Sequence, residues 1–81
     1  MSLRVLLFAA LAEAAGMREI ELDARALPDV GSVFDRLAGD CPKLEGYRSS
    51  LLFAVNQEYA RPDSPVRDGD EIAFFPPVSG G

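Results

Sequence analysis

One amphipathic helical stripe lies between two short apolar segments near opposite ends of the chain. Val30, Val33, Phe34 and Leu37 follow the i, i+3, i+4, i+7 spacing of a helix with a single apolar face. Arg4–Ala9 and Glu71–Phe75 carry apolar residues at consecutive positions, which is typical of strands buried on both faces. A chain of 81 residues has room for one core. We therefore expect the first and last strands to lie side by side beneath the helix.

Two local signals bound this helix. Asp29 is a favourable N-cap residue, because its short carboxylate can accept a backbone N–H of the first turn. Pro42 disfavours helical backbone in Cys41, so the helix should end near Asp40 or Cys41. Residues 44–50 are expected to form a short helical turn and a loop.

Local patterns also predict the remaining elements. In chain order they are an Ala-rich short helix Ala10–Ala15 ended by Gly16, a half-buried strand Arg18–Leu22, a strand Leu51–Val55, a turn at Asn56-Gln57 and a short edge strand Glu58–Ala60. This order predicts an α+β fold of ubiquitin-like β-grasp shape, with a mixed sheet packed on one main helix. The domain is expected to span residues 1–75, and residues 76–81 a flexible tail.

Composition excludes several kinds of chemistry. The chain has no His and one Cys, so catalytic pairs that need His, His-ligated metals and internal disulfides are impossible. The formal net charge of −5 disfavours nucleic-acid binding. No apolar run reaches membrane-spanning length. Residues 5–11 resemble a weak signal-peptide core, but cleavage would remove an expected central strand. We expect a cytoplasmic protein, since the lone thiol suits a reducing compartment.

Three further features have competing interpretations. Cys41 is a candidate persulfide-carrying thiol, but its place beside Pro42 favours a small residue at a helix end. Asp68, Asp70 and Glu71 favour a solvated turn over a metal site. One helix cannot cover both faces of a sheet, so Phe8 and Phe75 are expected on the uncovered face, whereas Phe53 and Phe74 belong to the core.

The end of the sequence suggests a function. Pro76 and Pro77 project the chain stiffly from a strand, and Gly80 and Gly81 carry no side chains. Six such residues span up to about 20 Å. A frayed end is one interpretation. The other is a tail that enters a narrow active site of another protein, where its terminal carboxylate is activated as an acyl-adenylate.

Three blocks of the sequence carry a family resemblance. They are Arg4–Ala9, Leu52–Gln57 and the final block Asp68–Gly81, with Asp-Gly-Asp, a strand, Pro-Pro-Val and Gly-Gly. Together they resemble the small, sulfur-carrier subunits of molybdopterin synthase, a ubiquitin-like family. Members often have Thr where this chain has Ser79.

The resemblance implies a carrier that works with three partners. An E1-like enzyme would adenylate Gly81, and a persulfide donor would convert it to a thiocarboxylate. The tail, positioned by Pro76, Pro77, Val78, Ser79 and Gly80, would then deliver sulfur to a cyclic pyranopterin monophosphate in the large subunit of a heterotetramer. Phe8, Tyr59 and Phe75 would form the partner interface.

The resemblance also implies which groups are absent. The active-site side chains would belong to the large subunit, and the carrier would hold no metal or resident cofactor, only AMP and sulfur in passing. Two alternatives stay open: a carrier for thiamine synthesis or tRNA thiolation, and a non-covalent β-grasp binding module.

Overall fold

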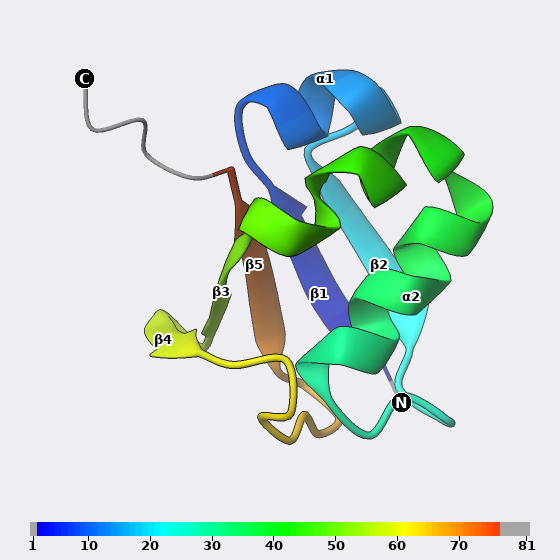
Figure 1. Cartoon of the computed structure of the whole chain (residues 1–81). Coiled ribbons are helices and arrows are strands. Elements are labelled where there is room, and N and C mark those ends of the chain that lie inside the picture. Colours follow the sequence, from blue (N-terminus) through cyan, green and yellow to red (C-terminus); the bar gives the residue numbers. More distant parts are fainter. Residues whose placement is uncertain (1, 77–81) are drawn as a thin grey trace.

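A twisted mixed sheet, with all the helical segments on one side of it, makes up the part of the chain that the structure describes (Figure 1). This computed structural model describes residues 2–76. The elements are β1 Ser2–Leu7, α1 Ala10–Ala15, β2 Glu19–Asp23, α2 Val30–Asp40, the 3₁₀ helix η1 Pro42–Ser50, β3 Leu52–Val55, β4 Glu58–Ala60 and β5 Glu71–Phe75.

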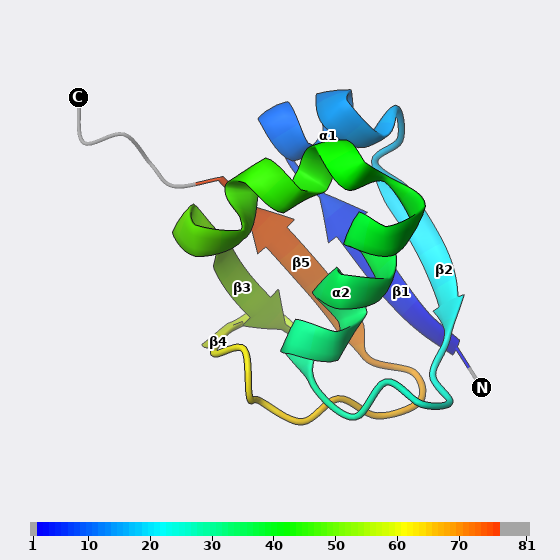
Figure 2. The same ribbon diagram turned by 45° about the vertical axis from the view of Figure 1, so that its right-hand side comes forward.

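The first and last strands are neighbours in the middle of the sheet. The strand order is β2-β1-β5-β3-β4, and β1 and β5 run parallel while the other neighbours are antiparallel. Both central strands therefore point to the same end of the molecule (Figure 2). This arrangement confirms the predicted α+β class and β-grasp shape, because a single sheet holds one main helix against its inner face.

Helix α2 begins and ends where the sequence predicts. Asp29 accepts a hydrogen bond from the Ser32 backbone N–H at 2.8 Å, and the Ser32 hydroxyl accepts from the Asp29 N–H at 3.1 Å, which completes a capping box. Every residue of the predicted apolar stripe is buried. The Phe34 ring lies 5.5 Å from that of Phe74, so the helix packs directly on β5.

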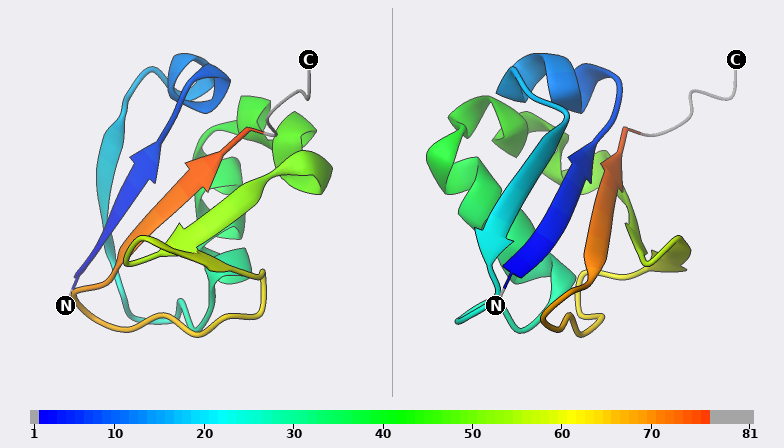
Figure 3. Two further views of the ribbon diagram at one scale, coloured as in Figure 1. Left: turned by 90° about the vertical axis from the view of Figure 1, so that its left-hand side faces the viewer. Right: turned by 180° about the vertical axis from the view of Figure 1, so that it is seen from behind.

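The prediction that the first strand is buried on both faces is wrong. Leu3, Val5 and Leu7 are buried in the core, whereas Arg4 is exposed and Leu6 half-buried. All the helices lie behind the sheet when it is viewed from its other side (Figure 3, right), so no helix or strand among residues 2–76 covers that face. Strand β1 also begins and ends two residues earlier than predicted, because the chain turns at Ala9.

The segment after α2 is more regular than predicted. Where a short turn and a loop were expected, residues Pro42–Ser50 form a nine-residue 3₁₀ helix. Runs of this length are uncommon because the 3₁₀ hydrogen-bond geometry is poor. Here Leu44 is buried in the core, and Arg48 pairs with Glu45 and Asp35 while its guanidinium lies 5.0 Å from the Phe34 ring centre. These contacts hold the segment against α2.

Candidate functional site

The face of the sheet opposite α2 is the open face, and strand register decides which side chains reach it. One row of paired residues crosses all five strands. Side chains of directly paired residues point to the same face. Because Phe74 contacts α2, the adjacent residue Ala73 faces the other way, and so does its whole row: Tyr59, Ala54, Ala73, Leu6 and Glu19.

Apolar side chains gather at one end of the open face. Leu52 pairs with Phe75 in the next row, and the Phe8 ring stacks on the Phe75 ring with centroids 4.8 Å apart and planes inclined by 13°. Tyr59 is 84% exposed, Phe8 41% and Leu52 38%. We call this set the apolar patch: Leu6, Phe8, Leu52, Tyr59 and Phe75. A clustered exposed apolar surface of this kind is typical of a protein interface.

The structure brings together all three residues predicted to meet partners, Phe8, Tyr59 and Phe75, on this one face. Phe74 is buried in the core, as predicted, whereas Phe53 is half-buried and packs against the core, with the two rings edge to face at 5.6 Å. Sequence reasoning missed Leu6 and Leu52. Counting alternation outward from Phe53 and from Leu7 would have placed both on the open face.

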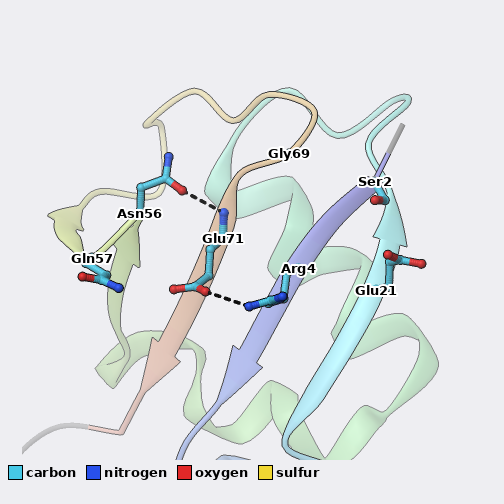
Figure 4. A pocket seen from close by; sticks show the side chains of 7 residues that line it. All are labelled: Ser2, Arg4, Glu21, Asn56, Gln57, Gly69 and Glu71. Carbon is cyan, nitrogen blue, oxygen red and sulfur yellow. Dashed lines mark hydrogen bonds and ion pairs between the residues drawn. The ribbon is translucent and has the colours of Figure 1, made fainter.

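Polar side chains occupy the other end of the open face. They line a shallow hollow of about 500 Å³ formed by Ser2, Arg4, Glu21, Asn56, Gln57, Gly69 and Glu71 (Figure 4). The Arg4 guanidinium lies 3.4 Å from a carboxylate oxygen of Glu71 and 3.4 Å from one of Glu19. With Glu21, these carboxylates outnumber the single cation, so this end is suited to accept hydrogen bonds from lysine or arginine side chains of another protein.

Asn56 connects the β3–β4 hairpin to the start of β5. Its side-chain oxygen accepts a hydrogen bond from the Glu71 N–H at 3.0 Å, and its amide donates to Asp70 at 3.0 Å. Both turn residues, Asn56 and Gln57, have positive φ (52° and 71°), as a two-residue type I′ hairpin requires. The hydrogen bond between Asn56 and Glu71, drawn in Figure 4, therefore helps to set the position of the polar end relative to β5.

The clear pKa shifts belong to ion pairs outside the apolar patch. Hydrogen bonds from the Arg25 side chain and backbone lower the pKa of Asp23 to about 2. The Arg48 side chain likewise lowers the pKa of Glu45, and its own pKa is raised by Glu45 and Asp35. Asp23 ends β2, and Glu45 lies in η1, so these pairs stabilise local structure.

The cysteine and the acidic turn that the sequence singled out have structural roles. Cys41 caps α2, as predicted, and its half-buried Sγ lies 3.5 Å from the Ala14 carbonyl oxygen. Asp68 accepts from the Ser2 N–H and Asp70 from the Arg67 N–H, as in a hydrogen-bonded turn. Within residues 2–76, no group of His, Cys, Asp or Glu is arranged to hold a metal ion. The same residues include no helix long and apolar enough to cross a membrane.

The predicted tail residues mostly fall beyond the described part of the chain. Pro76 is half-buried and directly follows β5. Pro77, Val78, Ser79, Gly80 and Gly81 lie outside the described residues. What the structure places is the start of the tail, which leaves the sheet next to the stacked rings of Phe8 and Phe75.

Comparison with known proteins agrees with this geometry. The ThiS family model matches residues 5–81. The molybdopterin synthase sulfur carrier subunit of Escherichia coli is 40% identical, with 98% of this chain and 99% of that protein covered. The crystal structure of SAMP1 from Haloferax volcanii has 38% identity and a TM-score of 0.85, and both chains are fully covered.

A more distant solved structure has the same fold. It is the complex of subunits 1 and 2 of the molybdopterin-converting factor from Helicobacter pylori, in which the matching chain has 22% identity, a TM-score of 0.69 and full coverage of both chains. The family match over nearly the whole chain and the full-length identity to the E. coli protein lead to one conclusion: this chain belongs to the ThiS family, together with the molybdopterin synthase sulfur carrier subunits.

Proposed function

We propose that this chain is the sulfur carrier of a molybdopterin synthase and that the sulfur is carried on the carboxyl group of Gly81. The observation that carries the proposal is the place where the last strand ends: β5 finishes at Phe75, whose ring stacks on Phe8 in the apolar patch, and the sequence beyond it ends in Gly80-Gly81. A partner that covers this patch has the beginning of the tail at its surface. The full-length similarity to sulfur carrier subunits supports the same assignment.

The chemistry requires activation of a poor electrophile. The Gly81 carboxylate attacks the α-phosphate of ATP and pyrophosphate leaves, which gives an acyl-adenylate. The terminal sulfur of a persulfide then attacks the acyl carbon and displaces AMP. A thiol then attacks the donor's sulfur in this acyl disulfide, so that a new disulfide forms on the donor and the thiocarboxylate leaves. The thiocarboxylate is a nucleophilic sulfur that a closed pocket protects from water.

None of these steps needs an acid or base from the carrier. The chain has no His, and Cys41 lies on the helical side of the sheet. The side chains that catalyse activation and transfer therefore belong to the adenylating enzyme and the large subunit. AMP and sulfur are bound only in passing at Gly81, and we propose no resident cofactor or metal.

The open face serves as the docking surface for these partners. The apolar patch offers aromatic anchors, which are the residues that dominate binding energy at interfaces. Glu19, Glu21 and Glu71 continue the same face and suit basic residues on the partner. Because the tail starts in the same patch, the adenylating enzyme and the large subunit bind in turn rather than together.

The intact mass of the protein, purified with a free Gly81 carboxyl group, tests the proposal. The protein is incubated with its adenylating enzyme, ATP and a persulfide donor, with a reaction lacking ATP as the control. We expect a mass increase equal to the exchange of one oxygen for sulfur, located at Gly81 by fragmentation. An unchanged mass, with an adenylating enzyme that thiolates another carrier in the same buffer, rejects the proposal in favour of a non-covalent binding module.

A second function uses the same activated carboxyl group. SAMP1, whose structure matches along the full chain, is named a small archaeal modifier protein. An acyl-adenylate can also react with the amine of a lysine on a target protein, forming an amide and releasing AMP. Incubation of the thiolated chain with large subunit and precursor separates the cases: a carrier for molybdopterin yields dithiolene product, whereas a modifier or a carrier for thiamine synthesis or tRNA thiolation does not.

A further inference from the structure

We propose that Ala9 is a positioning residue: its left-handed backbone turns the chain after β1 so that Phe8 stacks on Phe75, and this stack sets the direction in which the tail leaves the sheet. The inference rests on the proposed function, because the tail matters only if Gly81 is delivered to a partner's active site. Ala9 touches no reacting atom and acts through the two aromatic rings.

The turn at Ala9 has a backbone that alanine rarely adopts. Ala9 has φ 51° and ψ −126°, and the Leu11 N–H donates to the Phe8 carbonyl oxygen at 3.1 Å. These values describe a type II′ turn over residues 8–11, with Ala9 at the position that glycine usually occupies. A non-glycine residue in such a conformation is strained, and the surrounding structure must hold it there.

Buried residues on both sides hold the turn. Leu7 precedes it and is 3% exposed, and Leu11 follows it and is fully buried. Leu7 is the last residue of β1, and Leu11 belongs to α1, which begins immediately after the turn. The turn therefore reverses the chain from the end of the sheet onto its helical side, and Phe8 stays at the edge of the open face.

The position of Phe8 follows from the parallel pairing of the central strands. Leu7 and Phe74 are the last pair of β1 and β5, and both point into the core. Phe8 directly follows Leu7, and Phe75 directly follows Phe74, so both point to the open face, where their rings stack. On its other side Phe75 pairs with Leu52 of β3. Phe75 is thus held from both sides one residue before Pro76.

The orientation in which the stack holds Phe75 has a direct consequence for the tail. The chain beyond Phe75 starts from the position and direction of this last strand residue, so a change there shifts the point from which Gly81 is delivered. Reacting groups that are misplaced by about 1 Å can cost up to about 100-fold in rate. A stack that orients Phe75 therefore contributes to the rate of chemistry at Gly81, in addition to any area that it supplies for docking.

Two substitutions at Ala9 separate these contributions without altering a side chain of the apolar patch. Ala9→Gly keeps the turn, because glycine adopts positive φ freely. Ala9→Val is excluded from this backbone by its branched Cβ, so the turn must change. Ala26→Val is the matched control, because Ala26 is also exposed and also has a positive φ (65°). Ala26 lies far from the stack: it follows β2, and the last residue of β2, Asp23, pairs with Ser2 at the other end of β1.

The measurement is the rate of thiocarboxylate formation against the concentration of this chain at a fixed amount of adenylating enzyme, together with NMR cross-peaks between the rings of Phe8 and Phe75. For Ala9→Val we expect loss of the cross-peaks and a roughly tenfold lower kcat, with KM changed less than kcat. Ala9→Gly and Ala26→Val should keep both the cross-peaks and kcat. If Ala9→Val fails to fold in a thermal melt, Phe8→Leu, which stays apolar but cannot stack, should give the same loss of kcat.

Each contrary result has a distinct meaning. An unchanged kcat with a raised KM would show that the stack only enlarges the docking surface and would overturn the inference. Ring cross-peaks that persist in Ala9→Val would overturn the role of the turn. If the wild-type chain itself acquires no sulfur, the proposed function fails, and this outcome is separate from a failure at Ala9.

Discussion

Tyr59 lies directly opposite Ala54 across the β3–β4 pair, yet the tyrosine side chain is 84% exposed and the alanine 6%. Both belong to the open face. Ala54 is enclosed because it sits beside Ala73 of β5, within the sheet, whereas Tyr59 is on the edge strand with no neighbour beyond it. The largest exposed apolar side chain of the described residues therefore stands at the border of the patch and contributes little to the core.

Replacing Tyr59 separates binding from folding. For Tyr59→Ala we expect a change in unfolding free energy within about 0.5 kcal/mol, because the side chain is exposed. Affinity for the large subunit should fall by about 1–2 kcal/mol, because an exposed tyrosine at an interface is among the residue types that contribute most to binding energy. Titration calorimetry and chemical denaturation measure the two quantities. Arg36→Ala, on the exposed side of α2, is the control that should leave affinity unchanged; an equal loss in both variants would place the interface elsewhere.

Two glycines of α2 should respond differently to alanine. A Cβ at Gly39 meets no heavy atom within 4 Å, so Gly39→Ala should stabilise the protein by about 0.5–1 kcal/mol. A Cβ at Gly31 would lie 3.1 Å from the Pro62 carbonyl oxygen, which already accepts the Gly31 N–H at 2.7 Å. Gly31→Ala should therefore gain less or destabilise. Thermal melts of both variants test this ordering, which a larger gain at Gly31 would contradict.

Asn56 should contribute to stability through its side chain and through its backbone conformation. Asn56→Ala removes the acceptor for the Glu71 N–H and places alanine at φ 52°, so we expect a loss of about 1–3 kcal/mol. Asn56→Gly also removes the side chain but tolerates the positive φ, and should lose less. Urea denaturation gives both values. Equal losses would assign the whole effect to the hydrogen bonds.

The Asp23–Arg25 pair predicts a pH dependence. The pKa of Asp23 is lowered from 3.8 to about 2 in the folded protein, so the folded state favours the ionised carboxylate. The stability that this carboxylate contributes is present above the unfolded pKa and is lost as pH falls through the folded pKa. Unfolding curves should show Asp23→Asn less stable than wild type at neutral pH, with the difference fading between about pH 4 and 2. A difference that stays constant over this range would contradict the assignment.

The carboxyl terminus should be required for chemistry and not for folding. Deletion of Gly81, or Gly80→Trp, should leave the melting temperature unchanged because both positions lie beyond the last strand. Neither variant should form a thiocarboxylate that supports molybdopterin synthesis, since the carboxyl group is displaced or the tail is too wide for a narrow channel. Mass spectrometry and a product assay measure both steps. Product formed by the truncated chain would exclude Gly81 as the carrier.

Local patterns in the sequence predicted most of the fold. The stripe of α2, its Asp29 cap, the end of α1 at Gly16 and the central pairing of β1 with β5 all follow from spacing, capping chemistry and burial of apolar residues. The family resemblance implied the same fold, because the sequence blocks that carry the resemblance include the two central strands. These features depend on residues close together in the chain, or on the need to bury the two most apolar strands.

Other features were decided by tertiary contacts. Alternation divides the residues of a strand between two faces, but the continuous apolar run of the first strand concealed which face the helices cover; packing of all the helices on one side left Arg4 and Leu6 on the open face. The nine-residue 3₁₀ helix depends on burial of Leu44 and on Arg48 reaching Asp35, contacts between separate elements.

For the candidate site, the sequence by itself predicted that Gly80-Gly81 carry the chemistry and named the aromatic residues Phe8, Tyr59 and Phe75. The tertiary structure decided that these aromatic side chains share one face with Leu6 and Leu52, and that Ala9 takes a backbone which alanine does not choose on its own. The physical reason is that a composition or a spacing specifies groups, whereas register and packing specify which groups meet.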